Sequence, residues 1–361
     1  MTLKEHRTSP HVSIEQHIAT RAGSLRQSLE SRTPIYLDTR FWVMAREVED
    51  GTSQRPDECE IIRLLGEMVE SGAAFCPISE PTFSELMKQG NPAQRAATAQ
   101  AAQRLSMGVS ILPTLECMIG EAEDLVLGRL ATGQAPPRVP AWTSLAYVLG
   151  NIHVAGTPFA AADELAIQKA FYDRLWDEPL SAIALSMDSD VYTGRDELEQ
   201  QARDLTEANA RHAASMKSFE QVLECEFHGT AQSIVERSAQ LRATFEPLDR
   251  AAGKAPGSLA TNAIRAMLMD EQHARALPSA HVPAVLHTLF RWEFRGKPIT
   301  ANDLVDFRHA TAALSHCPLM LTEGTLRKAL GHQRMSLAAI HDTTVLSDRD
   351  EIVAELQQRT G

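Results

Sequence analysis

The pattern of hydrophobic and polar positions changes character along the chain. Residues 12–31 carry apolar side chains at the three- and four-residue spacings of a helix: Val12, Ile14, Ile18, Ala22, Leu25 and Leu29. The short apolar run Ile35–Tyr36–Leu37 then predicts a buried strand. A helix over "DECEIIRLLGEMVESG", a second strand over "AAFCPIS" and a helix over "EPTFSELMKQG" follow. This order predicts a β-α-β unit with one further helix.

The middle of the chain, from Asn91 to about Pro278, has a predominantly helical pattern. It contains long Ala-, Glu- and Gln-rich stretches such as "PAQRAATAQAAQRL", and proline- and glycine-containing loops separate them. One short apolar run, "VSILP" at 109–113, fits either a strand or the entry to a helix. We therefore expect a large, mainly helical segment.

The last section returns to alternating strands and helices. The pattern predicts a helix over "TANDLVDFRHATAALSH", a strand over "PLMLT", a helix over "EGTLRKALGH", a strand over "TTVLS" and a closing helix. We expect an α/β fold whose parallel sheet is formed by both ends of the chain, with a large helical insertion. The expected divisions are an N-terminal helix (1–32), an α/β domain (33–90 and 298–361) and the insertion (91–297).

Acidic residues stand where the predicted strands stop and helices begin. In an open parallel sheet, positions just beyond the carboxyl ends of the strands converge on one crevice, where such folds bind ligands. The candidates at these positions are Asp38, Glu80, Glu85, Asp303, Asp306 and Glu323. Clustered carboxylates repel one another, and their natural partner is a hard cation with oxygen ligands, Mg²⁺ or Mn²⁺. Such ions support phosphodiester hydrolysis, so the pattern points to a nuclease.

Four short motifs also resemble those of the PIN-like nuclease superfamily: "YLDTRFW", "FSEL", "DFRHATAAL" and "LMLTEGTL". The resemblance covers residues 33–90 and 298–350. It implies a Rossmann-like parallel sheet and a Mg²⁺ or Mn²⁺ site held by Asp38, Glu85 and Asp306. Glu323 falls where the family usually has an aspartate, and we expect it to be the fourth ligand. The resemblance further implies that the substrate is RNA.

Neighbouring residues supply secondary candidates. Thr39 and Thr322 flank two of the acids, and Asp303 and Glu80 are further acids at helix starts. Substrate-contacting candidates are Arg40, Arg308 and His309, which lies one helical turn after Asp306. Each residue alone also fits a structural role: aspartate after a strand is a common N-cap, and acids favour the first turn of a helix.

Composition limits the function classes. The five cysteines form no paired motif, so we expect neither a zinc knuckle nor a disulfide framework. No metalloprotease HExxH, hydrolase GxSxG or P-loop motif occurs. The N-terminal residues lack a secretory pattern and no segment predicts a membrane span, so we expect a cytoplasmic protein without a membrane partner. The net charge of −12 opposes binding of a polyanion except at a local basic surface.

The expected function is a metal-dependent endoribonuclease, with single-stranded DNA as another substrate to consider. One alternative is a catalytically inactive PIN-like scaffold that binds a protein or nucleic-acid partner. Another is a DNA nuclease in defence or repair. A protein regulator or antitoxin, and a homo-oligomer, are also compatible with the sequence.

Overall fold

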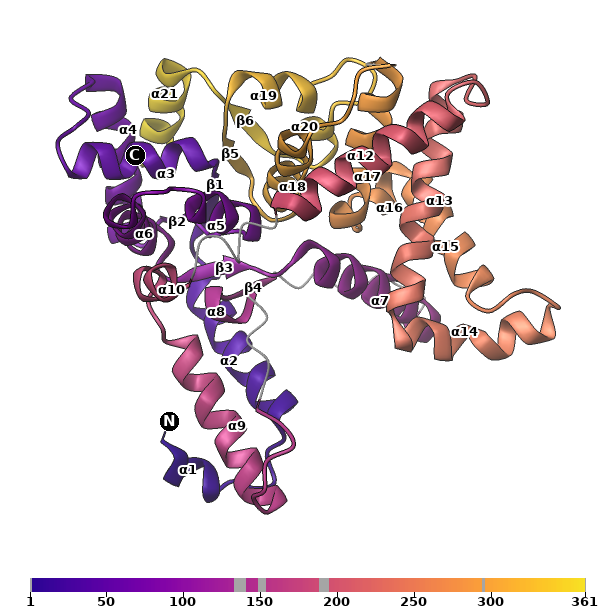
Figure 1. Cartoon of the computed structure of the whole chain (residues 1–361), viewed down its shortest axis with the longest axis horizontal. Coiled ribbons are helices and arrows are strands. Elements are labelled where there is room, and N and C mark those ends of the chain that lie inside the picture. Colours follow the sequence, from indigo (N-terminus) through magenta and orange to yellow (C-terminus); the bar gives the residue numbers. More distant parts are fainter. Residues whose placement is uncertain (1, 133–140, 149–153, 188–194, 294–295, 361) are drawn as a thin grey trace. The chain divides into compact units, whose positions relative to one another are not determined.

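The computed structural model describes residues 2–132, 141–148, 154–187, 195–293 and 296–360 (Figure 1). Most of these residues are helical. Four short strands pair in parallel, β1 with β2 and β5 with β6, and two more pair antiparallel, β3 with β4. The chain is therefore a mixed α/β protein dominated by helices. It divides into two compact units, which are described in turn.

The first unit combines residues 1–112, 140–193 and 347–361. Its strands are β1 (Thr33–Leu37), β2 (Ala74–Phe75), β3 (Val109–Ile111) and β4 (Trp142–Ser144). Its helices are α1 (Leu3–Arg7), α2 (Ile14–Leu29), α3 (Thr39–Glu49), α4 (Pro56–Glu70), α5 (Glu80–Met87), α6 (Pro92–Ser106), α8 (Leu145–Val148), α9 (Ala161–Trp176), α10 (Leu180–Ser186) and α21 (Arg349–Thr360).

The core of the first unit surrounds β1. Tyr36, Leu37, Trp42 and Phe83 are almost completely buried, and the Trp42 indole N–H donates to the Leu37 carbonyl at 3.1 Å. Burial of such large side chains is the main stabilising contribution to the unit. The predicted β-α-β unit is confirmed: β1 and β2 are parallel, and α3 and α4 connect them.

The second unit combines residues 113–139 and 194–346. Its strands are β5 (Leu319–Leu321) and β6 (Thr344–Leu346). Its helices are α7 (Thr114–Thr132), α12 (Arg195–His212), α13 (Phe219–Arg237), α14 (Ala239–Ala251), α15 (Ser258–Met269), α16 (Glu271–Ala274), α17 (Pro278–Glu293), α18 (Ala301–His316), α19 (Gly324–Leu330) and α20 (Leu337–Ile340). Helix α13 packs against α15 and α17, and α17 packs against α18.

The late strands and helices appear where the sequence pattern places them, as α18, β5, α19, β6 and α21. The open question at "VSILP" resolves as a strand, because β3 pairs antiparallel with β4. The two units do not coincide with the predicted domains, 33–90 plus 298–361 and 91–297. Those boundaries, and a Rossmann-like sheet completed by both chain ends, stay predictions.

Candidate active site

Asp38 lies at the junction of β1 and α3. It follows the fully buried Leu37 and is the N-cap of α3, and its carboxylate accepts a hydrogen bond from the Thr39 backbone N–H at 2.6 Å. Aspartate is favoured here because its oxygen satisfies a backbone donor that the first helical turn leaves unpaired. The side chain is half-buried, so the carboxylate stands at the edge of the core.

Glu85 brings a second carboxylate to the same place from α5. The Thr39 hydroxyl donates to Glu85 Oε2 at 2.5 Å, and an oxygen of Asp38 lies within 4.8 Å of an oxygen of Glu85. Glu85 is also half-buried. Two carboxylates at this separation repel each other in a partly desolvated position, and a cation between them would relieve that repulsion.

The fold of the first unit explains why these residues meet. Parallel pairing places Thr33 opposite Ala74 and Pro34 opposite Phe75, so the carboxyl ends of β1 and β2 lie at one edge. The chain enters α3 after β1 and α5 after β2. The buried Tyr36 hydroxyl lies 2.7 Å from the hydroxyl of Ser79, the N-cap residue of α5, and fixes the start of that helix against β1.

Two other candidates in this unit are Glu80 and Arg40. Glu80 is half-buried in the first turn of α5, where an acid is favoured by the helix dipole. The Arg40 guanidinium lies 3.4 Å from carboxylate oxygens of both Glu47 and Glu58. The predicted substrate contact of Arg40 would therefore compete with these ion pairs.

The second unit carries the remaining candidates, beginning with Asp306 and His309 on α18. They lie three residues apart and so share one face of the helix. Asp306 is half-buried, and His309 is 1% exposed. A histidine this deeply buried is better placed to orient a neighbouring side chain than to reach a polynucleotide.

Asp303 has a clear structural role at the start of α18. Its carboxylate accepts from the backbone N–H and the hydroxyl of Thr300, at 2.8 and 2.6 Å, and the Thr300 hydroxyl accepts from the Asp303 N–H at 3.2 Å. This is a reciprocal capping box. Asp303 is therefore a capping residue of α18, and its secondary role in the predicted site stays a prediction.

The last three candidates lie on α18 and between β5 and α19: Arg308, Thr322 and Glu323. Arg308 reaches the Gln201 amide oxygen at 3.5 Å. Thr322 is buried, and its backbone N–H donates to the Leu346 carbonyl at 2.9 Å as β5 ends beside β6. Glu323 is exposed at the N-cap of α19, where its side chain makes no capping hydrogen bond.

The structure thus brings together Asp38, Thr39 and Glu85 within the first unit. The predicted four-acid site also needs Asp306 and Glu323 from the second unit, and its assembly stays a prediction. A different group of residues of metal-ligating types lies within the first unit and is not predicted from the sequence: His6, His17 and Asp173. Nothing in the spacing of residues so distant in the chain indicates that they meet.

Comparison with models of protein families, with curated proteins and with solved structures gave no match. Among the described residues, no helix combines the length and apolar character needed to span a bilayer.

Proposed function

We propose that this chain is a metal-dependent nuclease of the PIN-like type, acting as an endoribonuclease through Mg²⁺ or Mn²⁺. The observation that carries the proposal is the approach of the Asp38 and Glu85 carboxylates to within 4.8 Å, beyond the ends of two parallel strands. The same two residues match the first and second motifs of the family resemblance. Residues 47 positions apart are thus brought together by the fold where the resemblance expects two ligands.

The donor set of the first unit fits a hard cation. Asp38 and Glu85 offer carboxylate oxygens, and Thr39, which donates to Glu85, adds a hydroxyl. Mg²⁺ and Mn²⁺ prefer oxygen ligands of this kind and need few protein ligands, since waters and substrate phosphate fill the other positions. In the proposed complete site, Asp306 and Glu323 supply the other carboxylates.

In this proposal, protein side chains bind the cation and hold the carboxylates in a fixed orientation. Asp38 is held by the N-cap hydrogen bond, and Glu85 by the Thr39 hydroxyl, so both carboxylates are fixed before substrate arrives. A divalent cation, when bound, would act as a Lewis acid that stabilises negative charge on the phosphodiester, and it would lower the pKa of a coordinated water. Because α3 begins at Thr39, the same turn orients both ligands.

RNA is proposed as substrate from the family resemblance. The net charge of −12 means that basic side chains must provide the phosphate contacts locally. Arg40, one residue after Thr39, is a candidate for this role and would have to exchange its contacts with Glu47 and Glu58 for phosphate. Arg308 is the corresponding candidate in the second unit.

Cleavage of labelled single-stranded RNA and DNA with Mn²⁺, Mg²⁺ or EDTA tests the proposal. Asp38→Asn keeps an N-cap acceptor, and Glu85→Gln keeps an acceptor for the Thr39 hydroxyl, so both remove charge with little change in structure. Glu70→Gln, at an exposed position at the end of α4, is the matched control.

We expect Mn²⁺-dependent RNA cleavage by the wild type and Glu70→Gln, reduced at least about 100-fold in each site variant because transition-state stabilisation is lost. Cleavage of DNA alone would select a DNA nuclease. No cleavage by the wild type, with either substrate, would favour the non-catalytic scaffold.

A further inference from the structure

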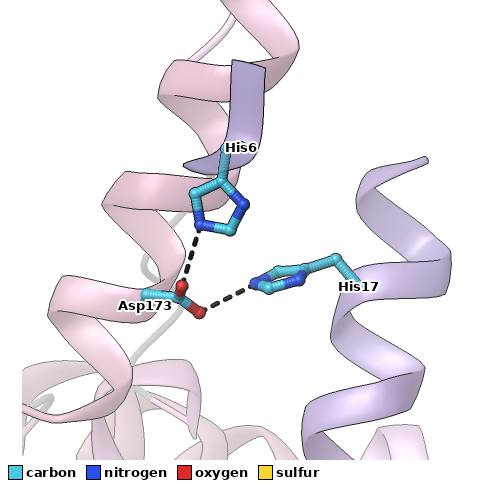
Figure 2. Close-up of side chains that lie close together, drawn as sticks. All are labelled: His6, His17 and Asp173. Atoms are coloured by element: carbon cyan, nitrogen blue, oxygen red, sulfur yellow. Dashed lines mark hydrogen bonds and ion pairs between the residues drawn. The ribbon is translucent and has the colours of Figure 1, made fainter. Parts of the chain in front are cut away.

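The first unit contains a second group of side chains of metal-ligating types, and this group includes neither Asp38 nor Glu85. His6 on α1, His17 on α2 and Asp173 on α9 point toward one another (Figure 2). His6 Nε2 lies 2.9 Å from Asp173 Oδ2, and His17 Nε2 lies 2.8 Å from Asp173 Oδ1. All three residues are buried, with at most 8% of any one exposed. The two imidazoles thus converge on one carboxylate, each at a different oxygen.

We propose that His6, His17 and Asp173 form a binding site for a divalent transition metal, Zn²⁺ being the ion that the donor set fits best. Two imidazole nitrogens and one carboxylate oxygen are a donor set that Zn²⁺ accepts, with a fourth position for water. The three donor atoms lie within 4.8 Å of one another. This site is independent of the proposed nuclease centre and has a different preference, because imidazole nitrogen suits Zn²⁺ better than Mg²⁺.

Metal binding would move each imidazole away from the Asp173 carboxylate. Neighbouring ligands of tetrahedral Zn²⁺ stand about 3.3 Å apart, because each lies about 2.0–2.1 Å from the metal. The histidine–carboxylate separations of 2.8 and 2.9 Å therefore need to open by about 0.5 Å. The imidazole rings meet edge to face, with centroids 5.0 Å apart, and both Nε2 atoms would turn toward one shared metal position.

Nearby cations have partners of their own. Arg21 Nε lies 3.8 Å from Asp173 Oδ1, but its Nη2 pairs with Asp177 at 2.7 Å. Lys169, one turn before Asp173, is buried and donates to the carbonyls of Ser9 and Val12 at 2.9 and 3.1 Å. Arg21 is therefore shared between Asp177 and a longer ion pair with Asp173, whereas Lys169 is directed toward backbone carbonyls.

The consequence of metal binding would be to attach the N-terminal residues to α9. Helix α1 has only five residues and is too short to be stable alone. Three side chains of α9 hold this region, since Asp163 pairs with Arg7 at 2.9 Å, Lys169 caps the turn after α1, and Asp173 contacts both histidines. A shared metal would make this attachment much stronger than hydrogen bonds alone.

Cobalt binding to the full-length chain tests the site. Co²⁺ replaces Zn²⁺ in tetrahedral sites and absorbs strongly in the visible region there, whereas octahedral Co²⁺ on carboxylates and water absorbs weakly. The background carries Asp38→Asn and Glu85→Gln so that the acidic pair does not contribute. The added variants are His6→Gln and His17→Gln, and His11→Gln at an exposed position between them is the control.

We expect one Co²⁺ per chain with an intense visible band, displaced by stoichiometric Zn²⁺, in the background and in His11→Gln. His6→Gln and His17→Gln should each weaken binding at least about 100-fold, because one of three ligands is lost. Zn²⁺ should also raise the melting temperature of the background protein and of His11→Gln, and should raise it much less in His6→Gln and His17→Gln. No intense band and no Zn²⁺-dependent rise in melting temperature would show that the three side chains form a hydrogen-bonded network only, and would overturn the proposal.

Discussion

The hydroxyl of Thr39 donates to the Glu85 carboxylate at 2.5 Å and so ties the first turn of α3 to α5. The backbone N–H of the same residue donates to the Asp38 carboxylate at 2.6 Å. One threonine therefore contacts both acids of the first unit's carboxylate pair. Its side chain orients Glu85, while its main chain orients Asp38.

Replacing Thr39 separates these two roles. Thr39→Val removes the hydroxyl but keeps the backbone N–H and the shape of the side chain, whereas Thr39→Ser retains a hydroxyl. Because a hydrogen bond that orients a ligand is typically worth 10- to 100-fold in metal affinity, we expect the Mn²⁺ concentration for half-maximal cleavage to rise about 10-fold in Thr39→Val. Thr39→Ser should stay near the wild type. Equal Mn²⁺ dependence in both variants would contradict a positioning role.

An ion-pair network around the buried Glu58 joins the C-terminal helix to α4. Glu58 is 2% exposed, and its carboxylate accepts from Arg349 at 2.6 Å and also from the Ser53 hydroxyl. Arg349 pairs with Asp57 as well, at 3.0 Å. Arg349→Met should lower the free energy of unfolding by about 2 kcal/mol, since hydrogen bonds to a charged, buried group are lost. Urea unfolding measures this change.

The control for that network lies on the same helix. Arg359 pairs with Glu355 at 2.7 Å, four residues earlier along α21. A single i, i+4 pair of this kind, with no fully buried partner, contributes only about 0.3–0.5 kcal/mol, so Arg359→Met should change stability much less than Arg349→Met. Similar losses in the two variants would show that burial of Glu58 does not strengthen the network.

The second unit contains a histidine that should make stability depend on pH. His281 is 3% exposed, and burial lowers its pKa to about 4. Its Nδ1 lies 3.0 Å from His341 Nε2. The unfolded chain therefore binds more protons between pH 6.5 and 4, and the stability present above pH 6.5 is lost as the pH falls toward 4, by up to about 3 kcal/mol.

His281→Gln tests this dependence because glutamine keeps hydrogen-bonding capacity without titrating. The free energy of unfolding of this variant should fall less steeply than that of the wild type between pH 6.5 and 4. The exposed His11→Gln should follow the wild type. Parallel curves for His281→Gln and the wild type would mean that His281 does not become protonated on unfolding in this range.

A glycine at the start of α15 is required by its conformation. Gly257 has a φ of +81°, and a Cβ there would lie 2.8 Å from Val235 Cγ1. Its backbone N–H donates at 2.7 Å to the buried Asp249 carboxylate, which also accepts from the Leu259 N–H. Gly257→Ala should lower the free energy of unfolding by about 1–3 kcal/mol. Gly120→Ala, where a Cβ meets nothing within 4 Å, should not destabilise the chain.

Local patterns were enough to predict many of the helices and strands, including those that carry Asp38 and Glu85. The apolar run before Asp38, the helix carrying Glu85 and the Thr300-x-x-Asp303 signature all depend on residues close in sequence. Such features are set by burial, strand alternation and helix capping, which a single sequence displays. The periodic late helices and strands were predictable for the same reason.

Features that depend on contacts between distant residues were not predictable. Strand β4, Trp142–Ser144, is recognisable only through its pairing with β3, because three residues carry too weak a pattern. Asp173 meets His17 across 156 positions, and no spacing rule indicates that contact. Likewise, Glu58 occurs in an ordinary charged helix turn, and its burial follows from packing that the sequence does not display.

Mn²⁺ binding, measured by calorimetry or by the electron paramagnetic resonance signal of free Mn²⁺, tests whether Asp38 and Glu85 hold a metal ion. Three proteins suffice: the wild type, the double variant Asp38→Asn with Glu85→Gln, and the Glu70→Gln control. We predict that the wild type and the control bind Mn²⁺ and that the double variant binds at least about 100-fold more weakly, because two carboxylates are lost. Equal Mn²⁺ affinity in all three proteins would contradict it.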